Sequence, residues 1–119
     1  MVIKRDDGTI VVQQLKIADN FFSRFMGLMG TKELREGEGL LIMPCNGIHM
    51  FWMRYSIDAV FLNQNYEIVH LERDIRPWKV SPIIKNARMV LEVPENTIDI
   101  KGLSLGDKLN IAELYEKDG

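Results

Sequence analysis

Hydrophobic and polar residues alternate along much of the chain, and this period of two predicts short β-strands. Two β-branched runs flank an Asp-Asp-Gly-Thr turn, which predicts an N-terminal hairpin from residues 2–5 and 10–17. Stretches rich in Gly, Asn and Pro separate the later runs from one another. The further predicted strands are residues 40–43, 57–62, 66–75, 87–93 and 108–114.

Two of these strands differ in the burial that their patterns predict. In the strand at 66–75, Val69, Leu71 and Ile75 are expected on one face and polar side chains on the other, which is typical of a half-solvated strand. In the next strand, Leu91 lies at the centre of an apolar alternation. We therefore expect that strand to be central and buried.

One segment has a clear helical spacing of apolar residues. Asp19 is its expected N-cap and Gly30 its expected end, and shorter helical turns are expected at 31–35 and after Asn96 or Thr97. The apolar side chains of the main helix are Phe21, Phe22, Phe25, Met26, Leu28 and Met29. About seven short strands with one short helix in the N-terminal half predict a mainly β fold, either an antiparallel β-sandwich or a partly closed barrel.

Length and composition fit one globular domain over residues 1–119, with 46% hydrophobic and 27% charged residues. The formal net charge is −2, and the 15 basic residues are scattered along the sequence, which argues against a nucleic-acid-binding surface. No stretch reaches the roughly 18 apolar residues that a membrane helix needs, so no membrane insertion is expected. Charged residues at the start and a single cysteine indicate no signal peptide and no internal disulfide, and we expect a cytoplasmic protein.

An ordered series of short motifs resembles the family known as domain of unknown function 192 (DUF 192, UPF 0127). The motifs are Arg24–Gly30, Gly37–Leu41, Ile48–Met53, Ile57–Leu62, Val90–Pro94 and Leu105–Asp107. The resemblance implies a small, mainly β, sandwich-like domain of bacteria and archaea with no settled biochemical activity. Family members often have a proline where Ser56 stands, and many lack counterparts of Cys45 and His49, which argues against a catalytic role for that pair across the family.

Cys45 and His49 are nevertheless the candidates for a nucleophile and its base, because an imidazole can generate the reactive thiolate. Residues four apart on an extended strand lie about 13 Å from each other, so the pair can meet only if the chain turns. A tight hairpin at Asn46-Gly47 would place the two side chains on opposite faces, whereas a wider loop could bring them together. We therefore expect a structural or loop-surface cysteine.

Metal and cofactor sites are not predicted. Cys45, His49 and His70 with Asp58 or Asp74 would form only a mixed metal site, and no closely spaced ligand pair supports one. The chain also has no glycine-rich phosphate loop, dinucleotide fingerprint or nucleophile elbow.

Arg54, Asp58, Trp52 and Trp78 are the predicted ligand-binding residues. A charged pair inside an apolar run, with an aromatic wall, is a suitable combination for orienting a polar ligand. The alternatives are that Asp58 accepts backbone hydrogen bonds or an ion pair from Arg54, and that the tryptophans are core anchors.

The sequence thus predicts a binding or accessory module for a small polar ligand or a protein segment. The alternatives are a small hydrolase or transferase using Cys45 with His49, and a structural partner in a larger assembly.

Overall fold

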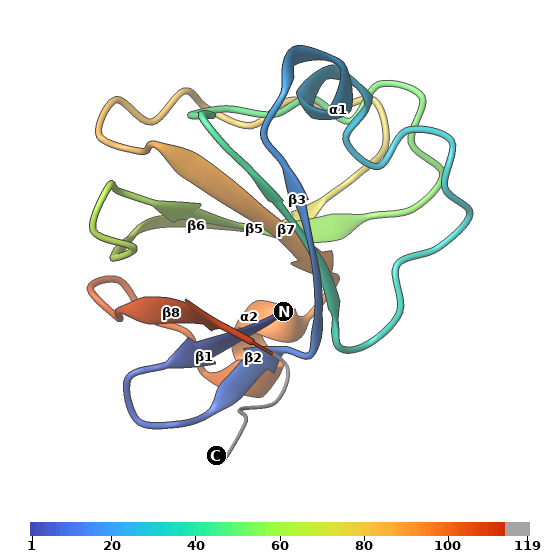
Figure 1. Ribbon diagram of the computed structural model, residues 1–119. Helices are drawn as coiled ribbons and strands as arrows, with labels where there is room; N and C mark the ends of the chain where they lie inside the picture. Colours follow the sequence, from blue (N-terminus) through green and yellow to red (C-terminus); the bar gives the residue numbers. More distant parts are fainter. Residues whose placement is uncertain (114–119) are drawn as a thin grey trace.

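The computed structural model describes residues 1–113, apart from the side chains of Phe21 and Phe22, and shows two β-sheets arranged as a sandwich (Figure 1). The predicted mainly β class is confirmed. The three-stranded sheet is antiparallel and has the order β2 (Ile10–Val12), β1 (Val2–Arg5) and β8 (Leu109–Ala112). The five-stranded sheet has the order β3 (Gln14–Ala18), β4 (Glu38–Ile42), β7 (Met89–Pro94), β5 (Ile57–Leu62) and β6 (Ile68–Ile75).

The expected N-terminal hairpin is divided between the two sheets. After β2 the chain passes Gln13 and enters the five-stranded sheet as β3, which pairs in parallel with β4. Parallel strands need a long crossover, and residues 19–37 supply it. The expected strand at 108–114 is present as β8, although Leu114 lies outside the described residues.

Helix α1 (Phe21–Met26) lies in this crossover. Asn20 caps it instead of the expected Asp19, because the Ser23 N–H donates to Asn20 Oδ1 at 2.8 Å and the Asn20 N–H donates to Ser23 Oγ at 3.3 Å. The helix ends at Gly27, earlier than predicted, where φ is +50°. No helix forms at residues 31–35.

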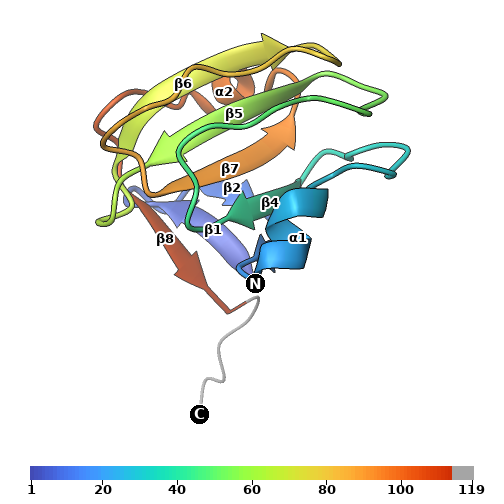
Figure 2. The same ribbon diagram turned by 90° about the horizontal axis from the view of Figure 1, so that it is seen from above.

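The five-stranded sheet is buried on both faces, and this decides the rest of the architecture. Its first face packs against the three-stranded sheet and α2 (Thr97–Lys101), and the shared cluster includes Ile3, Leu91 and Ile98. Its second face is covered by α1 and by the connections 43–56 and 76–88, which contribute Met50, Met53 and Ala87 to a second cluster (Figures 1 and 2).

Strand β6 departs from the predicted simple alternation. Its pairing with β5 shifts register twice, between Phe61 and Leu62 and again between Ile57 and Ala59. As a result Leu71 packs against the first cluster, whereas Val69 and Ile75 pack against the second. The expectation that these three side chains share one face is therefore wrong.

No helix among residues 1–113 is long and apolar enough to cross a membrane.

Leu91→Ala should lower the free energy of unfolding by about 2 to 5 kcal/mol, because Leu91 is fully buried between the two sheets. Denaturant unfolding measures the change. Leu105→Ala is the matched control, since Leu105 is 66% exposed and its truncation should change the free energy by less than about 0.5 kcal/mol. Equal effects of the two substitutions would contradict the assignment of Leu91 to the core.

Candidate functional site

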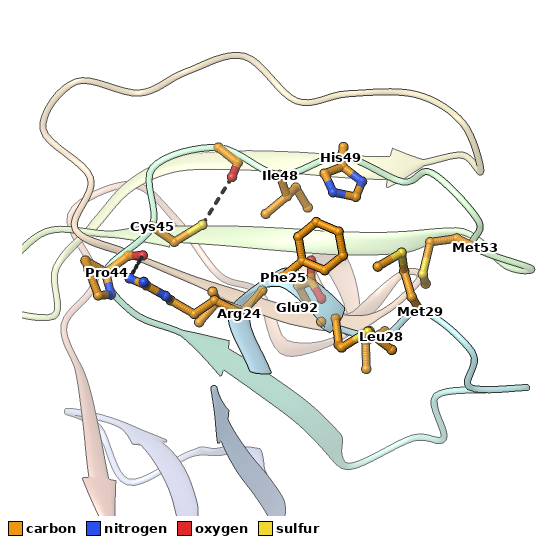
Figure 3. Close-up of a pocket in the computed structure, with 14 residues that line it drawn as sticks. Arg24, Phe25, Leu28, Met29, Pro44, Cys45, Ile48, His49, Met53 and Glu92 are labelled. Atoms are coloured by element: carbon orange, nitrogen blue, oxygen red, sulfur yellow. Dashed lines mark hydrogen bonds between the residues drawn. The ribbon is translucent and has the colours of Figure 1, made fainter. Parts of the chain in front are cut away.

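A cavity of about 260 Å³ lies on the second face of the five-stranded sheet, between α1 and the connection that follows β4 (Figure 3). Most of its wall is apolar. The polar side chains on it are Arg24, Cys45, His49 and Glu92. Its apolar side chains are Phe25, Met26, Leu28, Met29, Ile42, Pro44, Ile48 and Met53.

Glu92 comes from β7, the central strand of the sheet. Its neighbours Leu91 and Val93 point into the first cluster, so the strand alternation directs Glu92 to the second face, toward the cavity. A β-carbon on Gly27 would lie 4.0 Å from Glu92 Oε1, which places the carboxyl beneath the end of α1. The side chain lies behind Phe25 in the close-up view (Figure 3).

Glu92 is nearly buried, and its carboxyl oxygens keep a small contact with the cavity and have no protein partner among residues 1–113. The residue is only 5% exposed, and no side-chain hydrogen bond or ion pair joins it to any residue in the range 1–113. Removal from water disfavours the charged form and raises the pKa of Glu92 from 4.5 to about 8. At neutral pH the cavity therefore holds a protonated carboxyl group whose hydrogen-bonding capacity is unused.

Cys45 and His49 line the same cavity, but each bonds within its own loop. Cys45 Sγ donates to the Gly47 carbonyl at 3.1 Å, and His49 Nδ1 accepts from the Phe51 N–H at 3.2 Å. Burial raises the pKa of the Cys45 thiol, and the nearby Glu92 adds to the increase. The geometry therefore provides no activated thiolate.

The Asn46-Gly47 turn does not form the hairpin that its sequence suggested. The Cys45 N–H donates to the Arg88 carbonyl at 2.9 Å, and the Ile84 N–H donates to the Asn46 carbonyl at the same distance. The segment thus pairs with residues 76–88 instead of folding back on itself, and this pairing keeps Cys45 and His49 on the wall of one cavity.

Asp58 has a structural environment on the first face of β5. It is 1% exposed, and its two oxygens accept the Asp74 N–H at 2.9 Å and the Ile98 N–H at 3.0 Å. The prediction that it is buried and accepts backbone hydrogen bonds is confirmed. It fixes the irregular end of β6 to the first turn of α2. Arg54 is exposed and forms no ion pair with Asp58.

Trp52 and Trp78 lie together on the surface instead of in the core. They are 68% and 55% exposed, and their rings meet edge to face with centroids 4.9 Å apart. Phe51 contacts Trp78 on one side and stacks on His49 on the other, so a row of rings leads from the cavity wall to the surface. Neither tryptophan lines the cavity over Glu92, nor do Arg54 and Asp58.

The side chains considered for a mixed metal site are not brought together as one set. His70 is on β6, where its Nε2 is 2.7 Å from Glu72 Oε1. Within residues 1–113, no three His, Cys, Asp or Glu side chains are grouped closely enough to hold a metal ion.

Sequence reasoning missed Glu92. Alternation in β7 was used to place Met89, Leu91 and Val93 inside, which leaves Glu92 on the side that a half-solvated sheet would expose. The signal that could have revealed it is an acidic residue between apolar ones in the strand predicted to be central. Such a residue must be buried once both faces of the sheet are covered.

Comparison with known proteins supports the fold, and the description of the matching family names no activity. A model of the family DUF192, described as "Uncharacterized ACR", matches residues 2–111. A "UPF0127 protein" from Thermococcus sibiricus is 36% identical over 115 residues, covering 92% of this chain and 73% of that protein. Another from Pyrococcus furiosus is 32% identical over 101 residues, covering 81% of this chain and 84% of that protein.

Two crystal structures are similar in fold. A protein of unknown function from Novosphingobium aromaticivorans has a TM-score of 0.80 at 19% identity, with 92% of this chain and 82% of that chain covered. A putative transcription regulator from Sinorhizobium meliloti has a TM-score of 0.75 at 21% identity, with 92% of this chain and 89% of that chain covered. At these identities the likeness concerns the fold alone.

Glu92→Gln should make the protein more stable at alkaline pH. The unfolded chain loses its Glu92 proton above pH 4.5 and the folded protein only near pH 8, so the wild type loses stability as pH rises through this window. Between pH 5 and 8 the stability of the variant relative to the wild type should rise by roughly 3 to 4 kcal/mol. Urea unfolding of both proteins between pH 5 and 8 measures this difference in stability. The exposed Glu36→Gln should show no such trend, and parallel curves for wild type and Glu92→Gln would contradict the buried, unpaired carboxyl.

Cys45 should react slowly with iodoacetamide at pH 7, because its thiol is buried and its pKa is raised. The rate as a function of pH gives the thiol pKa. His49→Ala should leave that pKa unchanged, since no hydrogen bond joins the two side chains. A thiol pKa of about 6 or lower that increases in His49→Ala would establish the catalytic pair instead.

Proposed function

The chain belongs to the DUF192 family of uncharacterized proteins, and we propose that it is a binding module whose cavity over Glu92 takes a small ligand with an apolar body and a basic amine. The single observation that carries this proposal is the Glu92 carboxyl, which is buried, lines the cavity and has no partner among residues 1–113. A group of this kind is costly to a folded protein unless a ligand completes its bonding.

An amine is the ligand group that this carboxyl favours. Burying an ion pair is usually unfavourable because both charges must leave water. Here the carboxyl is already largely removed from water in the free protein, so binding requires that it lose its proton and that the ligand's ammonium group be desolvated. The resulting charge-assisted hydrogen bond is stronger than one between neutral groups.

The walls of the cavity suit a small apolar body. Met26, Met29 and Met53 contribute flexible thioether side chains that adapt to irregular shapes, and Leu28 and Ile48 add aliphatic surface. A cavity of about 260 Å³ suits a small ligand.

This site differs from the one that the sequence predicted. It keeps Cys45 and His49 as wall residues and uses Glu92 in place of Arg54 and Asp58 as the polar anchor. Asp58 is unsuited to ligand binding because two amides occupy its oxygens. The alternative of a cysteine hydrolase or transferase has less support, since burial holds the Cys45 thiol in its protonated form.

Titration with 1-pentylamine and 1-pentanol, followed by NMR chemical shifts of the methionine methyl groups, tests the proposal. We expect Glu92→Gln to weaken pentylamine binding by at least about tenfold and to leave pentanol binding nearly unchanged, because only the amine needs the charge. Glu36→Gln removes the same charge from an exposed loop and should change neither affinity. Absence of binding by both probes would contradict the binding module itself.

The pH dependence of pentylamine binding checks the assigned charge state. Binding of an ammonium ion requires the ionised carboxylate, so the affinity should increase from pH 6 to about pH 8 and then level off. The opposite trend would show that Glu92 acts as a protonated hydrogen-bond donor, and would replace the amine by a ligand with a carbonyl or hydroxyl acceptor.

A further inference from the structure

The two connections that cover the second face of the five-stranded sheet form a paired unit, which we call the outer ribbon (residues 44–56 and 76–88). The segments run antiparallel, with the Cys45 N–H bonded to the Arg88 carbonyl at one end and the Met50 N–H bonded to the Lys79 carbonyl at the other. They follow the upper edge of the molecule beside α1 (Figure 1). Their inner side belongs to the second hydrophobic cluster, and their outer side is free of other elements among the described residues.

The outer side exposes an unusual amount of large apolar surface. Trp52, Val80 and Ile83 are each more than 60% exposed, and Trp78 and Phe51 are exposed beside them. Surface of this kind, concentrated in one place, is typical of an interaction site.

The backbone presents both tryptophans in a strained conformation. Trp52 has φ of +68° and Trp78 has φ of +71°, a region that non-glycine residues rarely occupy. The Trp78 N–H bonds to the Met50 carbonyl at 2.8 Å, so the pairing of the ribbon holds this conformation in place. Strain and exposure are both unfavourable in the isolated protein, and they point to a role for the displayed rings.

Charge is segregated on the same ribbon. The chain as a whole carries 17 acidic and 15 basic residues, yet residues 44–56 and 76–88 contain no Asp or Glu. Their basic side chains, all exposed, are Arg54, Arg76, Lys79, Lys85 and Arg88. Arg76 lies 3.6 Å from Asp74, and the other four form no ion pair with any residue of the range 1–113. The ribbon thus carries five exposed basic side chains and no acidic one.

We propose that the outer ribbon docks on the surface of an anionic lipid bilayer. Tryptophan and phenylalanine favour the interface between headgroups and acyl chains, and nearby lysine and arginine side chains are attracted to anionic headgroups. Val80 and Ile83 distinguish this partner from a nucleic acid, because aliphatic side chains bury well in lipid and offer no stacking surface to bases. The docking is peripheral, and it is independent of the ligand proposed for Glu92.

Sedimentation of the full chain with phosphatidylcholine vesicles containing 30% phosphatidylglycerol, compared with pure phosphatidylcholine, tests the docking. We expect binding to the anionic vesicles that weakens as salt is added, with a blue shift of tryptophan fluorescence. Lys79→Glu combined with Lys85→Glu should reduce the affinity by at least about tenfold, since each lost basic residue costs roughly fivefold. Trp52→Ala should also reduce it while leaving the salt dependence in place.

Matched controls come from elsewhere on the molecule. Lys16→Glu combined with Lys108→Glu makes the same charge change on exposed positions outside the ribbon, and Leu105→Ala removes an equally exposed apolar side chain. These variants should keep at least half of the wild-type affinity. Circular dichroism melting of every variant shows that the fold is retained, and Trp52→Ala provides a charge-neutral test if the double charge reversal does not fold.

Three results would overturn the proposal. The first is no sedimentation with anionic vesicles at low salt, and the second is an equal loss of binding in the ribbon variants and their controls. The third is tighter binding to a single-stranded oligothymidine than to the vesicles, abolished by the same ribbon substitutions, which would assign the surface to nucleic acid.

Discussion

Burial of the five-stranded sheet on both faces is the constraint on which the rest of the structure depends. A sheet with apolar residues on each side must be covered twice, and the short chain meets this need with very different layers. The three-stranded sheet and α2 cover the first face. The second face is covered mostly by irregular structure, namely a helix of six residues and two paired loops. The cavity lies where the helix and the loops meet.

Two buried carboxyl groups differ in whether the fold satisfies them. Asp58 and Glu92 lie on neighbouring strands and point to opposite faces of the sheet. The backbone N–H groups of Asp74 and Ile98, in β6 and α2, donate to the two oxygens of Asp58, and this side chain therefore has a structural role. Glu92 lies next to a helix end and a loop, and no group of either forms a hydrogen bond with its carboxyl among the described residues. The irregular layer supplies no fixed partner, and that leaves the carboxyl available to a ligand.

Most strands were predictable because an apolar run between turn residues is local information, as in β5 and β7. What could not be predicted depends on distant parts of the chain. The parallel pairing of β3 with β4 and the register shifts that separate Val69 from Leu71 arise from neighbouring strands. Cys45 and His49, which the sequence singled out, line the cavity, but the burial of Glu92 follows only from the layer that covers β7. The tryptophans were predicted as the aromatic wall of a pocket, with core anchors as the alternative, whereas the ribbon displays them outward because the pairing of two distant loops sets their direction.

The pairing of β1 with β8 ties the first described strand to the last, with Val2 opposite Ala112. Contacts between residues so far apart in sequence form slowly, because a long loop must close before any of them contributes. During synthesis on the ribosome β1 has no partner on that side until β8 has emerged. Until then this edge of β1, which carries Val2 and Ile3, is unpaired, and an unpaired strand edge favours aggregation.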